Sequence, residues 1–123
     1  AIPQHIPHQD AVFNASRTAL YVGALMSGNY QYLNAALEDR LHQPYRIPLI
    51  TGTEAVFEAA KANGAYGAII SGAGSTLMAY VDPEKDCDII AAAMTDAFEK
   101  YGQRSTAHIL KLDINGAREK EHS

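Results

Sequence analysis

Apolar residues recur at helical spacing over the first part of the chain. Within residues 9–26 they form a stripe made of Val12, Ala15, Ala19, Val22 and Met26, and the neighbouring residues Leu20, Gly23, Ala24 and Leu25 widen it. So wide a stripe predicts a central helix that is mostly buried. Gly28 ends this helix, and the pattern of residues 30–41 predicts a second one with its charged side chains outward.

Two further helices are predicted later in the chain. Pro44 is expected to end regular structure, and a helix then follows over residues 53–62 with Thr53 as its N-cap. The run Asp82-Pro83-Glu84 combines a capping residue, a first-turn proline and a first-turn acid. It therefore predicts the start of a helix that reaches Gly102.

The strand-like segments determine the fold class. Residues 66–71 and 76–81 predict two strands joined by Gly72-Ala73-Gly74, and residues 108–114 alternate like a last strand before a charged tail. This order matches the ferredoxin-like pattern β-α-β-β-α-β without its first strand. We expect one α+β domain, an α/β sandwich in which an antiparallel sheet packs on helices.

Composition excludes several classes of protein. The 123 residues are 47% hydrophobic and 20% charged with a net charge of -4, which predicts a globular fold and no nucleic-acid binding. The longest apolar run, residues 19–26, is far below the roughly 20 residues that span a bilayer. The single cysteine, Cys87, forms no internal disulfide and fits a cytoplasmic location.

The loop between the predicted strands is the first candidate for chemistry. Small residues let the main chain approach an anion, and successive amides in such a turn can form a nest for phosphate or carboxylate. A glycine hairpin turn explains the same residues equally well. No lysine follows as in a Walker loop, and the third glycine of a dinucleotide fingerprint is absent.

Three blocks resemble one enzyme family. Ser71-Gly72-Ala73-Gly74-Ser75-Thr76 resembles the C-terminal glycine motif of GHMP kinases, although Ser75 stands where proline is usual. Residues 38–46 (EDRLHQPYR) are similar to a segment of the members that phosphorylate homoserine. Residues 10–17 (DAVFNASR) resemble the helix that opens their C-terminal domain.

The resemblance implies the reaction of the parent enzyme. Such an enzyme transfers the γ-phosphate of ATP to the side-chain hydroxyl of L-homoserine, a step in threonine biosynthesis. ATP and Mg²⁺ would be bound mainly by an N-terminal domain without a counterpart here. Because the chain begins at Ala1 rather than methionine, we expect a C-terminal fragment that is inactive alone.

The resemblance also implies site residues, none of them catalytic in this fragment. Arg46 would hold the substrate carboxylate beside Gly72, Ala73 and Gly74, whereas without the resemblance a solvated loop arginine is the simpler interpretation. Further candidates to line the cleft are Ser71, Ser75, Thr76, Asn14, Arg17 and His42. Capping and surface pairing explain Asn14 and Arg17 about as well, and residues 38–40 are interpreted as a solvated helix face.

Other functions stay open at this point. We expect no metal site, because His5, His8 and Asp10 lie on or beside an entry segment that contains two prolines and does not fix their geometry. A ferredoxin-like module that binds a small regulatory molecule, or a structural subunit, would also fit the pattern. We further expect a homo-oligomer, because a sheet without its central first strand exposes internal edges.

Overall fold

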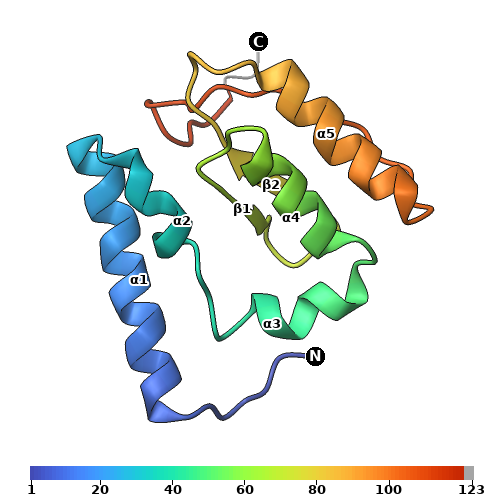
Figure 1. Cartoon of the computed structure of the whole chain (residues 1–123). Helices are drawn as coiled ribbons and strands as arrows, with labels where there is room; N and C mark the ends of the chain where they lie inside the picture. Colours follow the sequence, from blue (N-terminus) through green and yellow to red (C-terminus); the bar gives the residue numbers. More distant parts are fainter. Residues whose placement is uncertain (121–123) are drawn as a thin grey trace.

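The computed structural model describes residues 1–120 and combines five α-helices with one β-hairpin (Figure 1). The end of the charged tail, residues 121–123, lies outside the described residues. The elements in chain order are α1 (His8–Ser27), η1 (Tyr30–Tyr32), α2 (Leu33–Ala36), α3 (Gln43–Arg46), η2 (Ile47–Leu49), α4 (Thr53–Ala62), β1 (Gly67–Ile70), β2 (Leu77–Tyr80) and α5 (Cys87–Lys100).

The predicted hairpin is confirmed, with each strand slightly shorter than expected. Strands β1 and β2 pair antiparallel, with Gly67 opposite Tyr80 and Ile70 opposite Leu77. Beyond this ladder, the amide of Ser71 donates to the carbonyl oxygen of Thr76 at 2.8 Å. Residues 72–75 therefore form the tip of the hairpin.

Helices cover both faces of the hairpin. Because opposite residues of an antiparallel pair point the same way, Gly67 and Tyr80 share one face. This face meets α1 and α2: the hydroxyls of Tyr21 and Tyr80 lie 2.9 Å apart, and a Cβ on Gly67 would come within 2.7 Å of Leu37 Cδ1. The other face packs on α4, which also lies along α5 (Figure 1). The α+β fold class is thus confirmed.

The core lies where these helices meet the hairpin. Its buried side chains come from α1, α2, α4, α5 and β1. They are Ala24, Leu33, Ala36, Thr53, Val56, Ala60, Ile70, Ile90 and Ala97.

The two predicted helix caps are wrong. Gly52, with φ 91°, occupies the N-cap position of α4, while the buried hydroxyl of Thr53 donates to the carbonyl oxygen of Ile50 at 2.7 Å. Helix α5 begins after Asp86, whose carboxylate accepts from the amides of Asp88 and Ile89. Asp82 instead closes a turn, because its carbonyl oxygen accepts from the amide of Lys85.

The chain between α1 and α4 is less helical than predicted. The helix expected over residues 30–41 is only η1 and α2, and it ends at Ala36. Pro44, expected to end regular structure, lies instead in the first turn of α3. Proline suits that position because its missing N–H has no intrahelical partner there.

Helix α1 is less buried than its stripe predicts. Among the five stripe residues, Val12, Val22 and Met26 are 54%, 52% and 84% exposed, and only Ala24 of the whole helix is buried. The helix contacts η1 and α2 along one side. The described residues supply nothing to cover its opposite side, so the predicted burial is wrong.

The predicted last strand is also wrong. Residues 103–113 form no regular structure, and Leu110, Leu112 and Ile114 are 84%, 85% and 91% exposed. A strand exists only where its backbone groups find a ladder partner. Within residues 1–120 the only ladder is that of β1 and β2, so the alternation of residues 108–114 has no strand to pair with. No helix among the described residues has both the length and the apolar character needed to cross a membrane.

Candidate functional site

Arg46 and the glycine loop lie side by side, as the sequence predicts. Arg46 is the last residue of α3, and its Nη1 donates to the carbonyl oxygen of Ala73 at 3.0 Å. The two residues are 27 positions apart in the chain. The fold therefore brings a guanidinium group onto the tip of the hairpin.

The loop itself presents its backbone to solvent. Residues 71–76 are all exposed, and Gly72 has φ 62°, a conformation that favours glycine. A Cβ on either Gly72 or Gly74 would meet no atom within 4 Å. Among the described residues, the amides of residues 72–75 find no intrachain acceptor. Such a loop can receive an anion on its amides without displacing a side chain.

Arg46 keeps most of its hydrogen-bonding capacity. A guanidinium group has five N–H donors, and one of them is used on Ala73. Its Nε is buried and has no hydrogen-bond partner within residues 1–120. The three remaining Nη donors can engage a carboxylate or phosphate in the forked geometry that arginine favours.

Helix α3, which carries Arg46, is held at its start by one carboxylate. Asp39 Oδ2 accepts from the amides of His42 at 3.0 Å and Gln43 at 2.6 Å. Its Oδ1 accepts from the amide of Leu41 at 2.8 Å and from Asn14 Nδ2, on α1, at 2.7 Å. The interpretation of residues 38–40 as a solvated face is therefore wrong for Asp39.

The electrostatics of Asp39 follow from these contacts. Partial burial raises the pKa of the Asp39 carboxyl, but the hydrogen bonds from Asn14 and the amides of Gln43, Leu41 and His42 outweigh burial. Its pKa consequently lies below the usual value, and the group is ionised at neutral pH.

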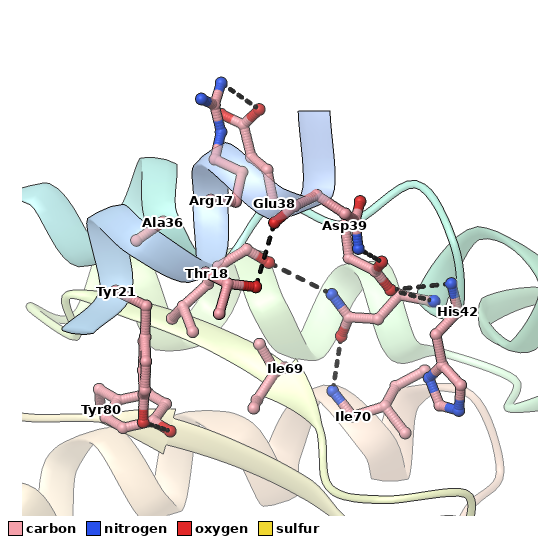
Figure 2. Close-up of a pocket in the computed structure, with 13 residues that line it drawn as sticks. Arg17, Thr18, Tyr21, Ala36, Glu38, Asp39, His42, Ile69, Ile70 and Tyr80 are labelled. Atoms are coloured by element: carbon pink, nitrogen blue, oxygen red, sulfur yellow. Dashed lines mark hydrogen bonds and ion pairs between the residues drawn. The ribbon is translucent and has the colours of Figure 1, made fainter. Parts of the chain in front are cut away.

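Gln43 ties the start of α3 to the end of β1. Its Oε1 accepts from the amide of Ile70 at 2.7 Å, and its Nε2 donates to the carbonyl oxygen of Leu37 at 3.5 Å (Figure 2). Ile70 is the last residue of β1, immediately before the glycine loop. The side-chain amide thus takes the place of a neighbouring strand at this point of the sheet edge.

Three other predicted candidates surround a separate cavity. Asn14, Arg17 and His42 line a space of about 350 Å³ between α1, the segment after α2 and the hairpin (Figure 2). None of residues 71–76 lines it. Arg17 pairs with Glu38 at 3.5 Å and lies over the ring of Phe13 at 4.2 Å. The candidate residues therefore divide into a loop group with Arg46 and a cavity group.

Asn14 and Tyr80, which both line this cavity, use their polar groups on partners within the chain. Asn14 Oδ1 accepts from the amide of Arg40 at 2.8 Å while its Nδ2 bonds Asp39, so both ends of the side-chain amide are used. Burial and the hydrogen bond with Tyr21 raise the pKa of the Tyr80 hydroxyl, which stays neutral.

Asp39 and Gln43 are not among the site residues that the sequence predicts. Asp39 precedes a proline-containing first turn, which is the sequence signature of a helix start, and that signal could have identified it. Gln43 carries no comparable signal, because its partners at Ile70 and Leu37 are defined only by the fold.

Comparison with known proteins gives consistent results. The model of the GHMP kinases C-terminal family matches residues 7–100. The chain is 47% identical over 115 residues to a homoserine kinase from Picosynechococcus sp., covering 94% of this chain and 37% of that protein. It is 44% identical over 116 residues to the homoserine kinase of Trichormus variabilis, covering 94% and 38% of the two chains.

A solved structure agrees with these relatives. The crystal structure of homoserine kinase from Cytophaga hutchinsonii superposes with a TM-score of 0.74 at 28% identity, covering 80% of this chain and 31% of that one. The chain thus spans less than two-fifths of the length of each of these three proteins.

Proposed function

Because the chain belongs to the GHMP kinase family, whose C-terminal domain model it matches, we propose that it forms the C-terminal part of a homoserine kinase. The complete enzyme would transfer the γ-phosphate of ATP to the side-chain hydroxyl of L-homoserine, releasing ADP and a proton. The support is the identity of 40–47% to proteins named homoserine kinase over nearly the whole chain. We propose a cytoplasmic, homo-oligomeric enzyme.

The contact between Arg46 and the glycine loop carries the assignment of roles. Arg46 anchors the carboxylate of homoserine through its free donors, and the amides of Gly72, Ala73 and Gly74 form the wall of the cleft that faces the transferred phosphate. Both groups act by position and charge, which is what phosphoryl transfer requires of a protein. The 3.0 Å contact between Arg46 and Ala73 makes one small substrate able to reach both.

The nucleotide and metal are assigned to the rest of the enzyme. Within residues 1–120 no three His, Cys, Asp or Glu side chains gather as metal ligands. We propose that ATP and Mg²⁺ are bound mainly by the N-terminal domain of the complete enzyme. Mg²⁺ supplies charge neutralisation of the ATP phosphates when it is bound. The part that this chain contributes is the substrate side of the cleft, and the chain alone should be inactive.

Activity of the complete gene product that contains this chain tests the proposal. Purified enzyme should form ADP from ATP only when L-homoserine is present, and mass spectrometry should detect O-phosphohomoserine. The 123-residue chain alone serves as the control and should form neither product. Turnover with mevalonate or galactose, but not with homoserine, would place the chain in another branch of the family.

A further inference from the structure

Helix α3 joins the end of β1 and the glycine loop at two points. Its first residue, Gln43, accepts a hydrogen bond from the amide of Ile70 at 2.7 Å. Its last residue, Arg46, donates to the carbonyl oxygen of Ala73 at 3.0 Å. The position of α3 therefore sets both the start of the loop and the place of the guanidinium group above it.

A helix as short as α3 cannot hold this position by itself. It has four residues, and a single helical turn forms one hydrogen bond while it fixes several dihedral angles. Asp39 compensates by accepting from the three consecutive amides of residues 41–43, between 2.6 and 3.0 Å. The approach to α3 is thus organised around one carboxylate.

Asn14 connects the carboxylate of Asp39 to helix α1. Its side chain donates to Asp39 Oδ1 and accepts from the amide of Arg40, at 2.7 and 2.8 Å. Asn14 belongs to the 20-residue helix α1. A continuous series of hydrogen bonds therefore runs from α1 through Asp39 and α3 to the glycine loop.

We propose that Asp39 is a positioning residue for substrate binding: by fixing the start of α3, it holds Arg46 and the glycine loop in the arrangement that receives an amino-acid carboxylate. The identity of that ligand rests on the proposed function. The mechanical coupling of Asp39 to the loop does not.

Asparagine cannot replace the carboxylate in this role. Four N–H donors converge on the two oxygens of Asp39, two on each. In an Asp39→Asn variant one of these oxygens becomes an NH2 group, which meets two donors and can accept from neither. The side chain keeps its size and loses half of its accepting capacity, so α3 should shift.

Kinetics of the complete enzyme test the positioning role. Asp39→Asn should raise the KM for homoserine at least tenfold and leave the KM for ATP within twofold. Glu38→Gln is the matched control, because it removes one carboxylate from the adjacent residue, which accepts no backbone amide. An unchanged KM for homoserine, or an equal rise in both KM values, overturns the proposal.

A double-mutant cycle separates positioning from general destabilisation. If Asp39 acts through Arg46, Asp39→Asn should have little further effect on the KM for homoserine in an Arg46→Ala background. Fully additive effects would show that the two residues act independently. Gln43→Ala, which cuts the tie to Ile70 directly, gives a second route to the same result if Asp39→Asn does not fold.

Hydrogen exchange distinguishes failure of this proposal from failure of the proposed function. In the complete protein, Asp39→Asn should increase amide exchange at Ile70 and Ser71, whose amides are hydrogen-bonded at the start of the loop, and Glu38→Gln should not. Faster exchange in a protein that does not phosphorylate homoserine would contradict the proposed function and support the coupling. Unchanged exchange would overturn the coupling, whatever the substrate.

Discussion

Nη1 of Arg46 lies 3.0 Å from the carbonyl oxygen of Ala73 and donates to it. This contact joins α3 to the hairpin tip across 27 residues of sequence. The carbonyl oxygen of Ala73 therefore faces the guanidinium group of Arg46. The amides of residues 72–75 have no acceptor within the part of the chain that the structure describes. The arrangement offers a small anion a guanidinium group and a backbone wall together.

Replacing Arg46 tests the proposed carboxylate anchor. In the complete enzyme, Arg46→Ala should raise the KM for homoserine and lower kcat/KM by about 2 to 4 kcal/mol of transition-state stabilisation, because a charged partner is lost. Arg46→Lys should recover only part of this loss, since lysine keeps the charge without the fork. Steady-state kinetics at varied homoserine provide the measurement, and unchanged values for Arg46→Ala would remove its role.

Gly74→Ala tests whether the loop is a ligand wall or only a turn. A Cβ at Gly74 would meet nothing within 4 Å, and Gly74 has no positive φ, so the melting temperature should not change. The methyl group would nevertheless stand where a phosphate approaches the backbone. We expect kcat/KM to fall by about tenfold or more, roughly 1.4 kcal/mol. Unchanged kinetics would favour the simple hairpin turn.

Elements whose partners lie close in the sequence were predicted better than elements that depend on distant partners. The hairpin and the end of α4 at Ala62 were predicted from turn residues and local spacing, although the caps predicted at Thr53 and Asp82 are wrong. The burial of α1 and the last strand failed, because both depend on segments that residues 1–120 do not supply.

The candidate site was also predicted only in part. The proximity of Arg46 and the loop was predicted from a family resemblance rather than from local pattern. The role of Asp39 was missed because one of its partners, Asn14, lies 25 residues away and only the fold brings the two together.

Gly52 should be required for stability at the start of α4. It has φ 91°, and a Cβ there would lie 3.1 to 3.3 Å from three atoms of Tyr101. Gly52→Ala should therefore destabilise the protein by about 1 to 2 kcal/mol from the left-handed conformation alone, with a further cost from displacing the ring. Gly23→Ala, within α1 and free of contacts, is the control and should stabilise by about 0.5 to 1 kcal/mol. Denaturant melts measure both, and equal effects would contradict this account.

Acid should weaken the fold through Asp39. Its pKa in the folded state is lowered, so its contribution to stability is complete above its unfolded pKa of about 3.9 and is lost as pH falls through the folded value. The free energy of unfolding should thus decrease below about pH 4, and less steeply in Asp39→Asn. Asp82, whose pKa the amide of Glu84 and the Tyr66 hydroxyl lower, should contribute separately in the same range. Denaturant melts from pH 2.5 to 6 check this, and identical slopes in wild type and Asp39→Asn would contradict it.

The exposed apolar segments predict that the 123-residue chain associates with itself when it is purified alone. Leu112 and Ile114 are 85% and 91% exposed, Met26 on α1 is 84% exposed, and the hairpin pairs with no third strand among the described residues. Burying apolar surface stabilises a complex by roughly 25 cal/mol per Å² of area removed from water. A strand edge without a partner can also pair with a strand of another chain.

Light scattering coupled to size-exclusion chromatography measures this association. We expect a mass of at least twice 13.3 kDa and a melting temperature that rises with protein concentration. Leu112→Lys should shift the equilibrium toward monomer by placing a charge in the contact, whereas Gln103→Lys, on the same exposed segment but outside its apolar part, should not. A monomer that melts cooperatively and independently of concentration would show that two strands and their helices suffice for a stable fold.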